Sequence, residues 1–191
     1  MKKYILIIKL LCLTVGFAQD KEDLNLLVAD STWDKEIIKF PIGFAQEIKF
    51  IGYEDLRFPP GWAKKESPEF WSYTWAWSIN DIEELTEKEL ETNIQLYFDG
   101  LMGINDSELP KTNALFIKKE AINGNRYIGK VKTFDTRFTN KPMTLNILVE
   151  NHYCESENKA IIVFRLSPKD FGSEVWDTLK EIKLKDGFCE N

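Results

Sequence analysis

Large aromatic side chains alternate with small ones along FWSYTWAWSI, residues 70–79. Successive side chains of a β-strand point to opposite faces, so a strand here gathers the bulky side chains on one face: Trp71, Tyr73, Trp75, Trp77 and Ile79. Each ring buries about 150–250 Å² when it leaves water, which favours a core position for this face, with a partly exposed cleft as the alternative. The small residues opposite leave room for a closely packed helix or for the floor of a pocket: Ser72, Thr74, Ala76 and Ser78.

Apolar periodicity and turn residues predict six further strands on either side of this segment. They cover residues 36–40, 47–58, 114–122, 126–138, 143–153 and 159–166. The fourth and fifth of the seven strands form a hairpin around Asn123-Gly124-Asn125, where Gly and Asn accept a positive φ. Because hairpin-length turns connect most of the strands, we expect a mostly antiparallel sheet.

Two helices are also predicted. Thr86 and Glu89 have the spacing of a capping box, and an apolar stripe at helical spacing follows: Leu90, Ile94, Tyr97, Phe98 and Leu101. Ser173 precedes a second stripe, formed by Val175, Trp176, Leu179 and Ile182. Both stripes require the sheet as a burial surface. The prediction is therefore one α+β domain over residues 33–191, with about six to seven strands and two helices in the order β-β-β-α-β-β-β-β-α.

The N-terminal residues have the pattern of an export signal. Lys2 and Lys3 precede the mostly apolar run Tyr4–Phe17, and small residues around Ala18 suit a cleavage site. We expect residues 1–18 to be removed, residues 19–32 to form a loosely ordered arm, and the protein to be periplasmic or secreted. An uncleaved anchor or a lipoprotein attached through Cys12 is the alternative. No later segment is long and apolar enough to span a bilayer.

The charge balance limits the classes of partner. The chain has 25 basic and 31 acidic residues, and removal of residues 1–18 takes away three lysines and no acid, which leaves a net charge of −9. Nucleic acids and anionic lipid surfaces both require a basic footprint. The net charge therefore argues against both as partners.

Cysteine and histidine are scarce. Cys154 and Cys189 remain after cleavage, and in an exported protein such a pair predicts a disulfide; two unpaired thiols are the alternative. The disulfide would remove the nucleophile from a Cys/His arrangement with His152. Because His152 is the one histidine, a zinc centre is disfavoured, and the sequence indicates no metal or other cofactor.

The aromatic segment and the loop before it form the candidate binding surface, within residues 58–77. The candidate ligand-binding residues are Phe58, Trp62, Trp71, Tyr73 and Trp75. Aromatic rings on a loop rim stack on sugars or hold apolar ligands. The favoured function is thus a non-catalytic binding or cell-envelope accessory domain, whose partner is an unidentified small molecule, glycan or protein.

An enzymatic function is the alternative. Glu54 or Asp55 would act as a general base and Arg57 as an anion clamp, in a carboxylate-dependent hydrolase of the cell envelope. The competing interpretation is a charged edge strand that resists pairing with other sheets. On alternation, Asp55 and Arg57 share one face and Glu54 lies on the other.

A second acidic cluster follows the first predicted helix, at Asp99, Asn105, Asp106 and Glu108. Its spacing fits no calcium-binding template, so a solvated loop is favoured over a cation site. The sequence contains no GxSxG, HExxH or EF-hand pattern and no phosphate-binding glycine loop.

Two resemblances extend these expectations. The run from Trp33 to Trp77 carries FP-x-x-FA, G-x-E-x-x-RF-x-PG and SY elements, and it resembles exported proteins common in Bacteroidota. That resemblance implies an exported compartment and no assigned activity. The order of elements over residues 33–188, with the terminal run IIVFRLSPKDFGSEVWDTLKEIKLKDGF, is similar to PsbP-like proteins. This second resemblance implies a binding or assembly role without a shared catalytic set.

Overall fold

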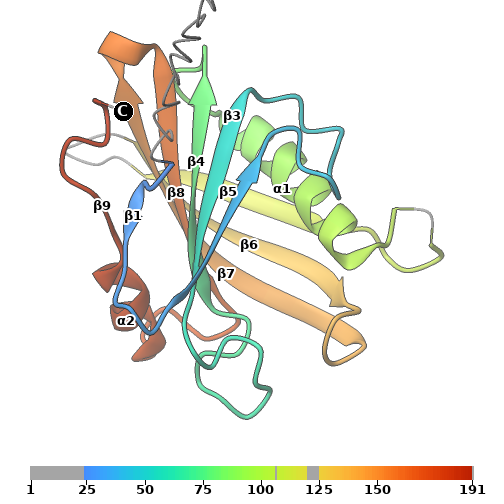
Figure 1. Cartoon of the computed structure of the whole chain (residues 1–191). Coiled ribbons are helices and arrows are strands. Elements are labelled where there is room, and N and C mark those ends of the chain that lie inside the picture. The colour runs from blue at the N-terminus through green and yellow to red at the C-terminus, as the bar shows by residue number, and fades with distance from the viewer. Residues whose placement is uncertain (1–23, 106, 120–124, 191) are drawn as a thin grey trace, which may run out of the picture.

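A computed structural model describes residues 24–105, 107–119 and 125–190, and its largest element is a seven-stranded antiparallel sheet (Figure 1). The spatial order is β2-β3-β4-β8-β7-β6-β5, and every neighbouring pair is antiparallel. The strands are β2 (Asp34–Lys39), β3 (Gly52–Phe58), β4 (Tyr73–Asn80), β5 (Asn113–Lys119), β6 (Asn125–Asp135), β7 (Lys141–Cys154) and β8 (Lys159–Ser167).

Two helices complete the predicted α+β order, which the structure confirms. They are α1 (Glu87–Met102) and α2 (Val175–Glu181), and a short 3-10 turn, η1 (Glu155–Glu157), joins β7 to β8. The structure adds a second, two-stranded sheet of β1 (Leu27–Val28) and β9 (Lys183–Leu184). The tip of the predicted hairpin lies outside the described residues, but the β5–β6 pairing that flanks it is present.

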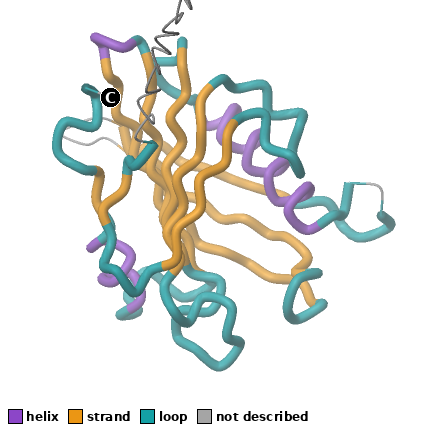
Figure 2. The backbone as a smooth tube through the Cα atoms, viewed as in Figure 1, coloured by secondary structure: helices purple, strands orange, loops and turns teal. Residues whose placement is uncertain are grey.

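Two of the predicted strands begin later than expected. β3 starts at Gly52 rather than residue 47, because residues 41–51 form successive turns that bury Ile42, Ala45 and Ile48 at three-residue spacing. β4 starts at Tyr73, since Trp71 has a left-handed backbone conformation with φ of 52°. Both differences enlarge the connections at the ends of these strands, and Figure 2 shows them as long loops.

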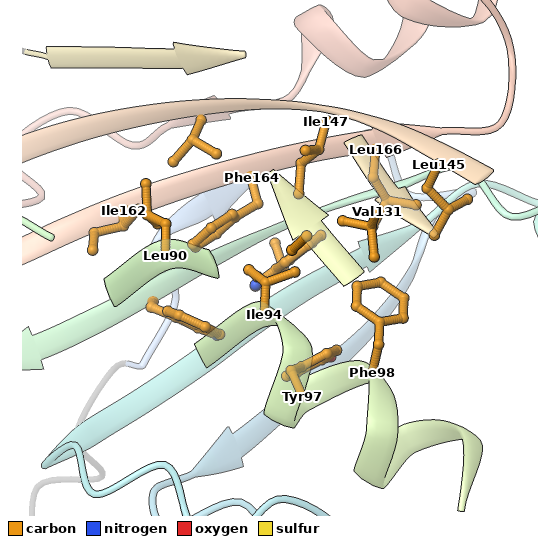
Figure 3. Close-up of a cluster of buried hydrophobic side chains, with 14 of the residues drawn as sticks. Leu90, Ile94, Tyr97, Phe98, Val131, Leu145, Ile147, Ile162, Phe164 and Leu166 are labelled. Carbon is orange, nitrogen blue, oxygen red and sulfur yellow. The ribbon is translucent and has the colours of Figure 1, made fainter. Parts of the chain in front are cut away.

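The sheet separates two covering layers. Helix α1 lies against one side, and the β1–β9 pair and α2 lie against the other (Figure 1). We call the first side the inner side and the second the outer side. The apolar stripe of α1 faces apolar side chains of β6, β7 and β8, and Figure 3 shows Leu90 and Ile94 on the side of the helix that is turned toward Phe164 and Ile147. No helix in the described part of the chain is long and apolar enough to cross a membrane.

The aromatic face of β4 is core, as predicted. Trp75 and Trp77 are completely buried, and the Trp75 ring stacks on Phe164 with ring centroids 4.6 Å apart. On the other side of Trp75, Tyr97 of α1 stacks nearly parallel at 5.8 Å. The ring face of β4 therefore joins α1 to the centre of the sheet.

The N- and C-terminal segments cover the small-residue face of β4 around Ala76. Leu26 and Leu27 are 1% and 3% exposed and pack with Ala76 and Ile161. Their backbone amides both donate to Asp55 Oδ2, at 2.8 and 2.9 Å. Within the expected arm, Leu26 and Leu27 are thus held against the sheet.

The predicted disulfide is present between Cys154 and Cys189, whose Cα atoms are 5.2 Å apart. It joins the end of β7 to the C-terminal segment that follows β9. A crosslink that closes a loop of this length contributes about 3–4 kcal/mol on the chain-entropy model. The bond therefore fastens the outer layer to the sheet.

Both ends of α1 follow the predicted signals, and the helix also protects an outer strand of the sheet. Thr86 and Glu89 form the capping box, and Gly103 closes the helix with a left-handed φ of 64°. Helix α1 runs beside β5, which has a sheet neighbour on one side only. Three carboxylates of the helix accept backbone N–H groups there: Asp99 from Thr112 at 2.7 Å, Glu91 from Phe116 at 3.4 Å and Glu87 from Lys118 at 3.3 Å.

Candidate functional site

A cavity of about 320 Å³ opens on the inner side, between α1 and the β2–β3 end of the sheet. Aromatic side chains from strands, helix and loops form most of its wall. The aromatic lining is Phe44, Phe58, Trp62, Trp71, Tyr73, Tyr97 and Phe138, joined by Ile38, Leu56 and Leu101 and by the charged pair Glu36 and Arg137. We call this cavity the aromatic pocket.

Two loops hold the pocket walls in place. In the connection from β3 to β4, the Trp71 amide donates to the Trp62 carbonyl at 2.8 Å, and Glu69 Oε2 accepts from the Gly61 amide at 2.7 Å. A Cβ atom on Gly61 would lie 2.4 Å from that carboxylate oxygen, so a larger residue there would displace the Glu69 side chain from its hydrogen bond. These bonds fix the Trp62 ring beside Phe58, with ring centroids 4.7 Å apart.

The second loop, residues 40–51, contacts α1 through its backbone. A Cβ atom on Gly100 would lie 1.8 Å from the Phe44 carbonyl oxygen, so only glycine allows the loop to approach the helix this closely. The approach places the Phe44 ring edge-on to Tyr97, with centroids 5.1 Å apart. The helix and this loop therefore form one wall of the aromatic pocket.

Trp71 lies in an unusual backbone position. A positive φ is rare for a bulky residue and costs about 1–3 kcal/mol, and here it turns the Trp71 ring into the pocket wall ahead of the strand. Its ring lies edge-on to Trp62 and Phe138. Strain of this kind concentrates at functional sites.

Phe138 was not predicted as a site residue. It extends from the β6–β7 turn to meet the rings of Trp62, Phe70 and Trp71 at 5.3–5.7 Å. Asp135 builds this turn, because its carboxylate accepts the amides of residues 137–139 and the Thr139 hydroxyl. Burial alone would raise the pKa of Asp135, but the hydrogen bonds from Thr139 and Phe138 outweigh it and lower the pKa.

A buried acid lies behind the pocket wall. Tyr97 donates its hydroxyl proton to Glu54 Oε1 at 3.0 Å. The other oxygen, Oε2, is buried without a hydrogen bond of ordinary length, although the nearby Trp77 indole N–H helps to stabilise the charge. Burial is the largest influence and raises the pKa of Glu54 to about 8, so the carboxyl group is mostly neutral at pH 7.

The pocket offers few polar groups to a ligand. Tyr73 is 2% exposed, and among the described residues its hydroxyl has no hydrogen-bond partner. Burial raises the pKa of Tyr73, so this hydroxyl stays protonated and is available as a donor. At the mouth, Glu36 and Arg137 are exposed, and neither forms an ion pair within the part of the chain that the structure describes. Arg137 Nε donates to the Leu101 carbonyl at 3.0 Å, which anchors its guanidinium at the rim.

The structure brings four of the five predicted binding residues together. Phe58, Trp62, Trp71 and Tyr73 line the aromatic pocket, whereas Trp75 lies between Phe164 and Tyr97 in the core. The alternation of β4 places Trp75 on the ring face but cannot show where α1 covers it. Trp75 is therefore corrected to a core residue.

The predicted catalytic set does not form one site. Glu54 lies on the inner side of β3, while Asp55 and Arg57 lie on the outer side, as alternation predicted. Arg57 pairs with Asp55 and donates to the Leu27 carbonyl at 2.6 Å. Asp55 and Arg57 thus fix the N-terminal segment, and the hydrolase hypothesis loses both its clamp and its second acid.

The remaining candidate residues, which were considered for a nucleophile or a cation site, do not form such a site among the described residues. Cys154 is in the disulfide, so it offers no thiolate to His152; burial is the main cause that lowers the pKa of His152. Asp99 of the proposed cation loop is buried and accepts the Thr112 amide, and Asp106 lies outside the described residues. Across residues 24–105, 107–119 and 125–190, no group of three or more Asp, Glu, His or Cys side chains is arranged to hold a metal ion.

Comparison of the chain with protein-family models, curated proteins and solved structures finds no match.

Proposed function

We propose that the protein is a non-catalytic, exported binding protein whose aromatic pocket holds a small, mainly apolar molecule. The observation that supports this function is the convergence of Phe58, Trp62, Trp71, Tyr73 and Phe138 on one cavity. These residues come from β3, the β3–β4 loop, β4 and the β6–β7 turn. Apolar clefts with few polar groups are the usual form of small-molecule sites.

The ring geometry favours a compact apolar ligand over a glycan. Sugar stacking uses a broad exposed ring face, but Phe58 lies 4.7 Å from Trp62, and Trp71 and Phe138 lie edge-on to it. The pocket consequently presents a mixture of ring edges and faces directed inward. Such a surface suits a ring or a branched hydrocarbon group.

The polar groups favour a ligand with one polar end. The Tyr73 hydroxyl is a donor within an otherwise apolar wall, and Arg137 at the mouth provides a cation on a fixed stem. A carboxylate or carbonyl on the ligand would satisfy either group. Volumes near 300 Å³ lie at the small end of the usual range for such sites.

The proposed export rests on the sequence pattern of residues 1–18 and is compatible with the disulfide. Structural disulfides persist in oxidising compartments, and Cys154 and Cys189 are paired. Cell fractionation with an antibody against the chain tests this part of the proposal. Recovery of the protein in the cytosol with residues 1–18 intact would exclude it.

Binding is tested by titration of wild-type protein with the fluorescent probe 1-anilinonaphthalene-8-sulfonate and with a library of ring-containing carboxylates, read by thermal shift. The Trp62→Ala variant opens the pocket wall and is expected to weaken binding by about tenfold or more, as for loss of a buried ring at a contact. Trp33→Ala is the matched control, because Trp33 packs in the outer layer. Absence of any ligand for the wild type, or equal affinities in wild type and Trp62→Ala, would count against the pocket.

A further inference from the structure

The outer side of strands β5, β6 and β7 carries an ordered pattern of aliphatic and basic side chains. Strand register aligns them in rows across the sheet. From the end of β5 inward, the rows are Lys119–Arg126–Glu150, Ile117–Ile128–Leu148, Leu115–Lys130–Asn146 and Asn113–Lys132–Thr144. We call these twelve positions the β5–β7 outer face.

Much of this face is left uncovered by the rest of the described chain. Leu115, Ile117 and Ile128 are 58%, 56% and 37% exposed, and they adjoin one another in the register. The outer layer reaches only as far as Leu148, which packs against α2. A cluster of exposed aliphatic side chains on one sheet face is typical of an interaction surface.

The charge of the face is opposite to that of the chain. Four exposed cations stand among the aliphatic residues, namely Lys119, Arg126, Lys130 and Lys132. The groove beside α2 adds Lys183, and also Lys180, which pairs with Asp177 at 3.2 Å. Glu150 is the one acid in the four rows, and it already bonds Arg126 at 3.3 Å and Arg165 at 3.1 Å. The chain as a whole has a net charge of −6. A partner for this face is therefore anionic and offers apolar contact.

The groove between the face and α2 extends the same chemistry. It has a volume of about 510 Å³, and its lining combines the aliphatic side chains of Ile128 and Leu148 with Lys119, Lys180 and Lys183. Aliphatic side chains at the centre with lysines around them match the layered polarity of a bilayer surface, where acyl chains lie beneath anionic headgroups.

We propose that the β5–β7 outer face docks on a bilayer surface that contains anionic lipid. Its composition favours lipid over an acidic protein, because protein interfaces are enriched in Trp, Tyr and Arg and depleted in Lys, whereas the cations of this face are mostly lysines. A long lysine side chain also reaches a headgroup while its stem covers apolar surface. The net charge of the chain argued against anionic lipid, but the field at a surface depends on the local distribution of charge.

The test is co-sedimentation with vesicles of phosphatidylcholine alone or with one third phosphatidylglycerol. The wild type is expected to bind the anionic vesicles preferentially, and less as the salt concentration rises. Each lysine near an anionic surface contributes about fivefold in affinity, so Lys130→Glu/Lys132→Glu is expected to weaken binding by about twentyfold or more. Ile117→Ser/Ile128→Ser is expected to weaken it by several-fold, because apolar area is lost.

Matched controls separate this face from general effects. Lys64→Glu/Lys65→Glu changes the net charge equally on the exposed β3–β4 loop, and Ile51→Ser removes an exposed aliphatic side chain elsewhere. All proteins carry the same N-terminus, so its contribution cancels in the affinity ratios. Circular dichroism verifies that each variant is folded.

The result is decisive in either direction. Equal losses in the loop controls and in the face variants would overturn the proposal, as would equal binding to both kinds of vesicle. Failure of the wild type to bind the anionic vesicles would also exclude it and favour an acidic protein as the partner. The aromatic pocket lies on the other side of the sheet, so Trp62→Ala is expected to leave vesicle binding unchanged whether or not the pocket binds a ligand.

Discussion

The two faces of strand β3 hold neighbouring carboxylates in contrasting environments. On the outer side, Asp55 accepts two backbone amides and pairs with Arg57. On the inner side, Glu54 has a single hydrogen bond from Tyr97 and one buried oxygen without a bond of ordinary length. The outer acid is fully satisfied and the inner acid is not.

This difference shows on which side of the sheet the chain itself supplies the hydrogen-bond partners of a buried carboxylate. A buried carboxylate is tolerated when hydrogen bonds replace its hydration, and the N-terminal segment supplies them to Asp55. Beside the aromatic pocket, Glu54 is equally buried but receives one hydrogen bond, from Tyr97, in place of the several that Asp55 receives. The inner side therefore retains polar capacity next to an open cavity, as expected for a binding site.

The largest expected effect concerns Glu54→Gln. Because the folded pKa of about 8 exceeds the ordinary carboxyl pKa of 4.5, the contribution of Glu54 to stability is fully present below pH 4.5 and is lost as the pH rises to 8. Relative to the wild type, the variant is expected to gain up to about 4–5 kcal/mol across that interval. Urea unfolding of both proteins at several pH values measures the difference.

Glu36→Gln is the control for that experiment, because Glu36 lies on the same side of the sheet but is exposed. It makes the same chemical change outside the buried cluster. A difference between Glu54→Gln and wild type that stays constant with pH would show that Glu54 is ionised in the folded protein at neutral pH.

On the outer side, Asp55→Ala is expected to lower the free energy of unfolding by about 3–5 kcal/mol. The substitution leaves the buried Arg57 cation without its partner and two buried amides without their acceptor. Urea unfolding at pH 7 measures the loss, and amide hydrogen exchange at Leu26 and Leu27 shows whether the N-terminal segment has opened. Unchanged protection of those two amides would contradict the anchoring role of Asp55.

The smallest effect on stability is expected for Phe138→Ala, about 1–2 kcal/mol for a half-buried ring. Its effect on the aromatic pocket is expected to be larger, because Phe138 contacts both Trp62 and Trp71. A red shift of the tryptophan emission, together with weaker probe binding, measures the opening of the wall. Phe171→Ala, at an exposed ring beside Trp176, is the control. Similar emission shifts in both variants would show that the fluorescence change does not report on opening of the pocket.

The sequence predicts the sheet and its core well, because local patterns determine them. The alternation around Trp75 and Trp77 and the capping box at Thr86 each report on a single element, and both are confirmed. Glu54 and Asp55 were also assigned correctly to opposite faces, since that follows from strand geometry alone.

The assembled site could not be predicted in the same way. Phe138 joins the pocket through a turn built by Asp135, and Trp71 enters it through a left-handed φ. Both depend on contacts between segments far apart in the sequence. Asp135 five residues before Asn140 is a usable turn signal, but nothing local to it indicates which loop Phe138 would meet. For the same reason, sequence alternation alone left Trp75 among the candidate binding residues.

The carboxylates that α1 directs at β5 also determine how this molecule can meet others. A backbone amide already bonded to Glu91 or Glu87 offers nothing to an incoming strand, so the end of the sheet is a poor template for growth by a further chain. A partner that approaches β5 at these positions therefore meets side chains rather than free amides.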